Sequence, residues 1–100
     1  MKVTIVGNKD ECLGFSLAGA LPQIVNSEDE FISDMEKLLK DTEIGIIIVV
    51  DRYFEMYSKH FTSETKKRAL PAIVFVPSID KQYLKRDLKG FLANVLGIKL

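Results

Sequence analysis

Short apolar runs alternate with longer segments of mixed apolar and polar residues along the whole chain. Four runs stand out, at residues 2–7, 22–25, 45–50 and 71–77. The third run contains no polar side chain, which is typical of a strand buried on both faces of a parallel sheet. The pattern therefore predicts four strands, with residues 45–50 at the centre and the proline-led run at 22–25 at an edge.

The segments that follow the first two runs have the caps and the spacing of helices. A helix is expected at residues 11–20, with Asp10 as its N-cap. Ser27 and Glu30 stand three residues apart, as in a capping box, and open the next helix. The apolar residues of that helix recur on one face, which predicts packing on the sheet: Phe31, Met35, Leu38 and Leu39.

The segment after the third run predicts a helix that begins at Asp51, a favourable N-cap residue. Thr62-Ser63 can cap a second piece of this helix, which then ends near Lys66-Lys67-Arg68. Basic residues are favourable at a helix C-terminus because they meet the negative end of the helix dipole.

A last helix is predicted at about residues 81–96. Its apolar positions recur at i, i+4, i+7, i+8 and i+11 and form one stripe: Leu84, Leu88, Phe91, Leu92 and Val95. Basic residues fill much of the remaining surface: Lys81, Lys85, Arg86 and Lys89. The stripe suits packing on the sheet, and it also suits docking in the groove of a partner.

The alternation of strands and helices predicts an α/β fold. We expect a small four-stranded parallel sheet in flavodoxin-like order, with helices on both faces and a C-terminal helix beyond it. The one candidate boundary lies at Pro77-Ser78. It divides the chain into an α/β N-terminal domain at residues 1–78 and a C-terminal helical segment at residues 79–100.

Composition narrows the classes of function. The 100 residues carry 14 Lys and Arg against 14 Asp and Glu, a formal net charge of zero, whereas nucleic-acid binding needs a basic stripe. No run of about 18 apolar residues occurs, so no membrane insertion is expected, and the N-terminus does not have the pattern of a signal peptide. A single cysteine excludes an internal disulfide and fits a reducing, cytoplasmic compartment.

Two residues invite a catalytic or phosphoacceptor interpretation. Asp51 follows the central strand, where a receiver domain carries its phosphorylated aspartate, but the acidic pair that would hold Mg²⁺ is replaced by Gly7-Asn8-Lys9. Cys12 resembles the cysteine of a phosphocysteine carrier, but it stands several residues too late. The alternatives are a helix cap for Asp51 and a small buried residue for Cys12.

No metal, cofactor or catalytic constellation is expected from the remaining residues. His60 has neither a second histidine nor a metal-ligand cysteine beside it, which favours a surface or helix-end position. The turn at residues 7–9 matches neither of the glycine-rich phosphate-binding motifs.

The stretch Gly14-Phe15-Ser16-Leu17-Ala18-Gly19-Ala20 places two glycines in the first predicted helix. After a strand, it resembles the first-helix segment of the F subunit of the rotary V-type and archaeal-type ATPases. Three other stretches agree in the same order, at residues 2–10, 44–49 and 71–78, so the resemblance covers nearly the whole chain. Gly14 and Gly19 then allow close packing or docking, with apolar contacts from Phe15, Leu17 and Ala18.

The resemblance implies a mechanical role without catalysis. In that family the F subunit sits on the central stalk beside the D subunit, under the ring of A and B subunits, in the soluble sector peripheral to the membrane. Its C-terminal helix reaches toward the ring and affects ATP hydrolysis. Carried onto this chain, the stripe of residues 84–95 would dock, and Lys85, Arg86 and Lys89 would meet an acidic partner surface. The complex couples ATP synthesis or hydrolysis to ion or proton transport.

Overall fold

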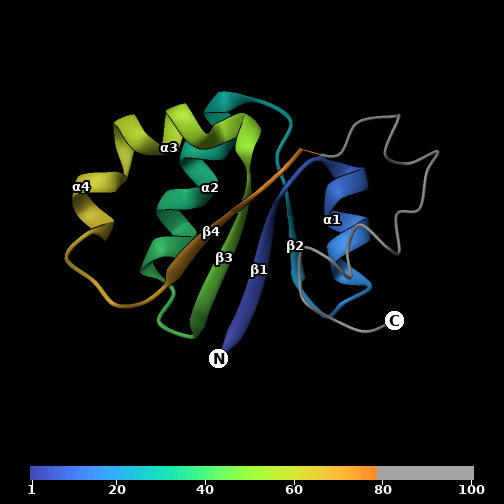
Figure 1. Cartoon of the computed structure of the whole chain (residues 1–100), viewed down its shortest axis with the longest axis horizontal. Helices are drawn as coiled ribbons and strands as arrows, with labels where there is room; N and C mark the ends of the chain where they lie inside the picture. Colours follow the sequence, from blue (N-terminus) through green and yellow to red (C-terminus); the bar gives the residue numbers. More distant parts are fainter. Residues whose placement is uncertain (79–100) are drawn as a thin grey trace.

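A computed structural model describes residues 1–78 as a four-stranded parallel sheet with helices on both faces (Figure 1). The strand order is β2-β1-β3-β4, which is the flavodoxin-like order predicted. The helix predicted at residues 81–96 lies outside the described residues. The elements are β1 (Lys2–Gly7), α1 (Lys9–Ser16), β2 (Leu21–Ile24), α2 (Glu28–Lys40), β3 (Ile44–Val50), the 3-10 turn η1 (Asp51–Tyr53), α3 (Phe54–His60), α4 (Thr62–Thr65) and β4 (Ala72–Val76).

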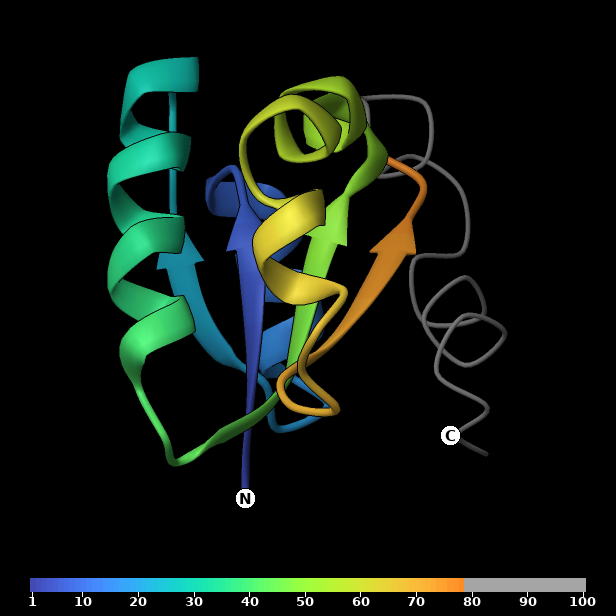
Figure 2. The same cartoon turned by 90° about the vertical axis from the view of Figure 1, so that its left-hand side faces the viewer.

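The helices divide unequally between the two faces of the sheet. α1 packs on β1 and β2 on one face, and α2, α3 and α4 lie on the other (Figures 1 and 2). On the second face, the Gln23 amide of β2 donates to Asp34 of α2 at 2.9 Å, and Phe75 of β4 packs edge-on against Tyr57 of α3. Because side chains alternate along a strand, the neighbours of Phe75 and Val49 point to the α1 face.

That alternation leaves apolar side chains on the β3–β4 half of the α1 face. Ile46 and Val74 point there and are 37% and 44% exposed. Among residues 1–78, α1 covers the other half of this face, over β1 and β2. The rest of β3 is buried, as its continuous apolar run predicted, so Ile46 is the exception on that strand.

The core between the sheet and α2 and α3 is rich in aromatic rings. Phe31 and Tyr53 stack with ring centroids 4.6 Å apart, and Phe61 meets Phe31 edge-on at 6.2 Å. The α2 stripe turns inward as predicted, since Phe31, Met35 and Leu39 are buried. Fully burying a side chain of this size contributes about 1.5–3 kcal/mol, so this stripe holds α2 on the sheet.

The first helix begins and ends earlier than its sequence pattern suggested. α1 starts at Lys9 and its N-cap is Asn8, so the assignment of Asp10 as the cap is wrong. The Asn8 side chain accepts the Glu11 N–H at 2.9 Å, and the Glu11 carboxylate accepts the Asn8 N–H at 2.8 Å. This reciprocal pair satisfies two helix-end donors, which a cap at Asp10 could not do in the same way.

The remaining helix and strand boundaries differ from the prediction by a few residues or by the partner of one hydrogen bond. Ser27 caps α2 as expected, but the Glu30 carboxylate accepts the N–H of Asn26 rather than that of Ser27. β2 begins one residue earlier than predicted, at Leu21, and β4 excludes the two prolines that flank it. The helix expected from Asp51 to about residue 68 is three pieces, and the last, α4, ends at Thr65.

Candidate functional site

Polar side chains gather at the carboxyl edge of the sheet, where ligands bind in open parallel sheets. Asn8 follows β1, Asp51 and Arg52 follow β3, and Ser78 lies two residues beyond β4. Glu11 joins them from the first turn of α1. The topology thus brings together residues from three neighbouring strand ends, and they form the candidate site.

Glu11 is the buried centre of this cluster. Its side chain is 0% exposed, and both carboxylate oxygens accept hydrogen bonds from Arg52, at 3.1 and 3.0 Å. The Arg52 side chain stays 40% exposed, and the carboxylate beside it raises the pKa of the guanidinium. Bidentate pairing to arginine compensates the cost of burying a carboxylate, so this pair locks α1 to the end of β3.

Gly7 is required for this packing. A Cβ at this position would lie 2.9 Å from Glu11 Oε1 and 3.1 Å from Val50 Cγ1. Neither neighbour has freedom to move, because Glu11 is held by Arg52 and Val50 is fully buried. The glycine therefore has a structural reason, and it is the last residue of β1, joined to α1 through Asn8 alone where a turn at residues 7–9 was predicted.

Asp51 does not cap a helix, so that interpretation is wrong. It is the first residue of η1, which has no side-chain cap, and its carboxylate accepts two hydrogen bonds from Ser78. The Ser78 N–H and Oγ–H donate to Asp51 Oδ1 at 3.1 and 2.8 Å, and the Ser78 hydroxyl accepts the Arg52 N–H at 3.2 Å. Asp51 thus fastens the exit from β4 to the end of β3.

Cys12 is a buried side chain of α1, as the structural interpretation predicted. It is 1% exposed, and its thiol lies 3.5 Å from the Gly7 carbonyl oxygen and 3.7 Å from that of Ile5. Burial is the main cause that raises the pKa of this thiol. A raised pKa and an enclosed sulfur are the opposite of what a nucleophilic cysteine needs.

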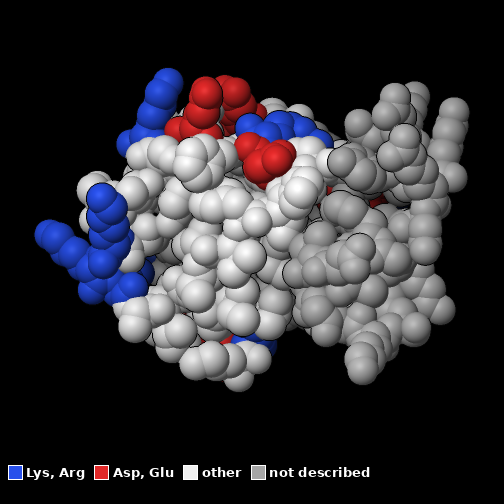
Figure 3. Space-filling model, in the orientation of Figure 1, with Lys and Arg blue, Asp and Glu red and all other residues white. Residues whose placement is uncertain are grey.

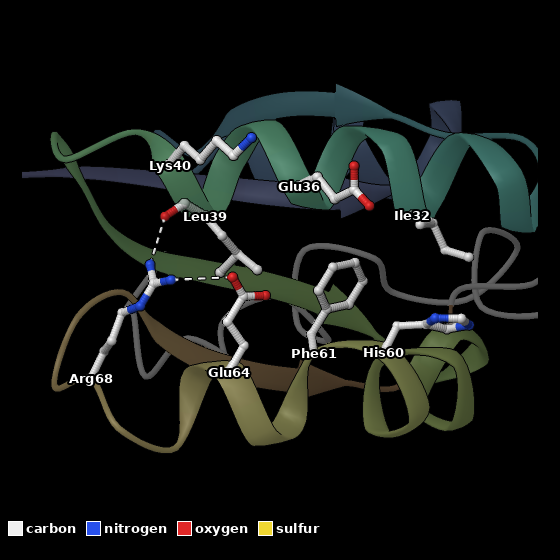
Figure 4. A pocket seen from close by; sticks show the side chains of 8 residues that line it. All are labelled: Ile32, Glu36, Leu39, Lys40, His60, Phe61, Glu64 and Arg68. Atoms are coloured by element: carbon white, nitrogen blue, oxygen red, sulfur yellow. Dashed lines mark hydrogen bonds and ion pairs between the residues drawn. The ribbon is translucent and has the colours of Figure 1, made fainter.

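His60 is the last residue of α3 and is exposed, as expected for a helix-end histidine. It lies at one end of a groove of about 280 Å³ between α2 and the α3–α4 pair (Figure 4). Arg68 lies at the other end, where it donates to the Leu39 carbonyl at 3.0 Å and to Glu64 at 3.4 Å. Arg68 therefore satisfies a carbonyl at the end of α2, not the end of its own helix as predicted.

The Gly14–Ala20 stretch divides into a buried part and an exposed part. Gly14 and Phe15 are buried in α1, with Phe15 in the core. Leu17 is 75% exposed, and Ala18 and Gly19 are exposed in the turn that follows. Gly19 has a φ of 98°, so it was wrongly predicted to lie inside a helix: it serves a left-handed turn.

The surface carries charge at its ends and little over the edge strand. Figure 3 shows Lys and Arg gathered over α4 and the loop beyond it, basic and acidic side chains together along the upper end where α3 lies, and an uncharged area over β4. Phe54, Leu70 and Val74 are 51%, 48% and 44% exposed. The predicted docking residues, Leu84, Lys85, Arg86, Leu88, Lys89, Phe91, Leu92 and Val95, lie outside the described residues.

The site is arranged to hold chain segments together. Within residues 1–78, no three His, Cys, Asp or Glu side chains are grouped so as to hold a metal ion. In the same part of the chain, no helix has the length and hydrophobicity to cross a membrane. The sequence reasoning missed Glu11 and Arg52, although a glutamate three residues after Asn8 was a usable capping-box signal.

The fold and the site define the class of the protein. It is a parallel α/β domain in which the polar groups at the carboxyl edge of the sheet bond to one another. Residues 3–94 match the model of the family described as ATP synthase (F/14-kDa) subunit. Since the match spans nearly the whole sequence, the chain belongs to this family.

Proteins named as the F subunit of A-type ATP synthase are similar along most or all of their length. The protein of Thermococcus onnurineus is 37% identical over 108 residues, which cover 100% of this chain and 98% of the relative. That of Methanothrix thermoacetophila is 23% identical over 101 residues, with the same coverage. That of Archaeoglobus fulgidus is 29% identical over 76 residues, 75% of each chain.

Proposed function

We propose that the chain is a non-catalytic, central-stalk component of an A-type ATP synthase. In this role it binds the D subunit and couples or regulates ATP turnover and ion transport in the soluble sector of the complex. The observation that carries the proposal is the family match over residues 3–94, together with relatives named as F subunits that align end to end.

The geometry of the described domain supports a role in binding proteins. Large apolar side chains are exposed on α1 and around β4, among them Leu13, Leu17, Phe54 and Val74. The polar groups at the carboxyl edge bond to one another and tie the domain together. Exposed apolar surface on a domain whose strand ends are bonded to one another suits a protein that binds protein partners.

The C-terminal segment provides the proposed contact with the catalytic ring. Residues 84–95 carry an apolar stripe flanked by Lys85, Arg86 and Lys89, which suits a groove with an acidic rim. In this proposal residues 1–78 bind the D subunit, and residues 79–100 reach the A and B subunits.

Co-purification tests this proposal. The chain, with and without residues 79–100, is mixed with the D subunit and with the A and B proteins from the same cell. We expect both forms to bind the D subunit. We expect only the full-length form to change the rate of ATP hydrolysis by the A and B subunits. A folded chain that binds neither the D subunit nor the ring would overturn the proposal.

The receiver-like alternative, with Asp51 as phosphoacceptor, is the competing hypothesis. Its phosphoacceptor, Asp51, uses Oδ1 to accept both Ser78 hydrogen bonds. No labelling of the chain by acetyl phosphate with Mg²⁺ is expected, in the wild type or in Asp51→Asn.

A further inference from the structure

The hydrogen bonds of the carboxyl edge form one continuous chain across three strand ends. Asn8 bonds with Glu11, Glu11 with Arg52, Arg52 with Ser78, and Ser78 with Asp51. The first two residues belong to the β1–α1 junction, and Ser78 is the last residue that the structure describes. The start of α1 and the exit from β4 are thus connected indirectly, through Arg52.

Ser78 is the first residue after β4 with a backbone N–H that can donate a hydrogen bond. Pro77 has no N–H, so the chain between Val76 and Ser78 makes no donor contact. Three hydrogen bonds hold Ser78: its N–H and hydroxyl donate to Asp51, and its hydroxyl accepts from the Arg52 backbone. These three bonds fix the point and the direction in which the chain leaves the sheet.

Arg52 takes part in this chain twice, through different atoms. Its guanidinium grips the buried Glu11 carboxylate in two parallel bonds, and its backbone N–H donates to Ser78 Oγ. A bidentate grip fixes the orientation of the guanidinium, and a lysine ammonium cannot form the two parallel bonds. The grip thereby restrains the position of residue 52, whose backbone N–H Ser78 accepts.

We infer that Arg52 couples the start of α1 to the exit from β4 at Ser78. Loosening the grip of Arg52 on Glu11 weakens the hold on Ser78, although Glu11 and Ser78 share no bond in the chain. A change imposed on α1 by a binding partner thereby reaches the junction with residues 79–100. The inference does not rest on the proposed function, because it concerns contacts within the isolated chain.

Hydrogen exchange of single amides, measured by NMR on the full-length chain, tests this coupling. In Asp51→Ala, the Ser78 amide should exchange at least about tenfold faster, since it loses a charged acceptor. Arg52→Lys keeps both bonds of Ser78 and loses only the paired grip on Glu11, so the Ser78 amide should exchange faster by up to about fivefold, the factor for one ordinary hydrogen bond. Arg68→Lys is the matched control, because Arg68 is also bonded twice and its side chain is 42% exposed.

Three results would overturn the inference. An unchanged Ser78 rate in Arg52→Lys beside a faster rate in Asp51→Ala would restrict the contact to Asp51 and Ser78. Equal acceleration in Arg68→Lys would show a general loosening. An unprotected Ser78 amide in the wild type would remove the contact itself. The exchange rates of the Val6 and Val49 amides in the core show whether each variant is folded. If Arg52→Lys unfolds, Glu11→Gln takes its place.

Discussion

Gly7 lies where β1, α1 and β3 meet at the carboxyl edge of the sheet. Its sequence context suggested a simple turn at residues 7–9, whereas Gly7 is the last residue of β1 and Lys9 is the first of α1. The reason for a glycine here lies mainly in residues far along the chain. Val50 and the Glu11–Arg52 pair leave no room for a Cβ. A local pattern can reveal a turn, whereas the close approach that demands glycine depends on contacts that only the fold brings together.

Gly7→Ala is expected to destabilise the domain by about 1–3 kcal/mol, because it overpacks a site whose neighbours are fixed. Gly45→Ala is the control. Its added Cβ would meet the side chain of Met1, which is 90% exposed and able to move aside. Urea denaturation followed by circular dichroism measures both. An equal, small loss in the two variants would contradict this explanation of Gly7.

The Cys12 thiol is expected to make the free energy of unfolding depend on pH in the alkaline range. Burial raises its pKa above the ordinary value of 9.0, so the unfolded chain ionises first as the pH rises. The free energy of unfolding should therefore be unaffected by Cys12 below pH 9 and fall between the unfolded and the folded pKa. Comparing the pH slopes of wild type and Cys12→Ala from about pH 8 to 10.5 checks this. Parallel slopes would contradict it.

Among the helices and strands, sequence reasoning succeeded where the decisive contact is local. Ser27 was identified as a cap because its partner, the N–H of Glu30, is three residues away. Asp51 was misassigned because its partner, Ser78, is 27 residues away in sequence and reaches it only after β3 and β4 pair. Asp10 was assigned as the cap of α1 from its residue type and position alone, whereas the return bond from Glu11 makes Asn8 the cap.

The end of α1 shows a second limit of inference from pattern. The prediction of a helix at residues 11–20 ignored the possibility that a glycine near the end of a helix marks its C-terminus. The helix stops at Ser16, the chain turns through Gly19, and Ala20 is buried as β2 begins. The Gly14–Ala20 stretch therefore forms the end of α1 and the connection that leads to β2.

Gly19→Ala is expected to cost about 1 kcal/mol, because alanine is strained at a φ of 98°. Among residues 1–78, no atom outside Gly19 and its two chain neighbours lies within 4 Å of the added Cβ, so the cost within this part is conformational. Gly19→Asn should cost less, since asparagine tolerates the left-handed region better than other side chains. Thermal unfolding of both variants measures the difference. A loss in Asn as large as that in Ala would point to a contact in place of backbone strain.

Across the molecule, the core, the sheet order and the family agree with what the sequence predicted. The apolar runs and the spacing of capping residues were enough for the strand order, because parallel α/β units permit few topologies. The carboxyl-edge network was not predictable in the same way. It combines single residues from three strand ends, and no periodic pattern announces such a combination.

Deletion of residues 79–100 is expected to leave a folded domain, because the described residues 1–78 already contain a continuous buried core. Calorimetry should show one cooperative transition. Loss of cooperative unfolding would show that the last segment belongs to the core.

A charge on the C-terminal stripe separates a docking role from a core role. Phe91→Glu should leave the fold intact and weaken the effect on the A and B subunits if the stripe docks on the ring. Lys89→Glu is the charge control, because it changes the charge of the segment without altering the apolar stripe. Thermal unfolding beside the ATPase assay distinguishes the two cases. An unfolded Phe91→Glu chain would place the stripe in the core.

The proposed assembly requires that this chain bind the D subunit of its own complex. Isothermal titration of the purified D subunit with the full-length chain tests this requirement, with unfolding curves to establish that both proteins are folded. We predict a saturable complex that forms equally with the chain shortened to residues 1–78. Two folded proteins that release no heat and elute separately on gel filtration would contradict the proposal.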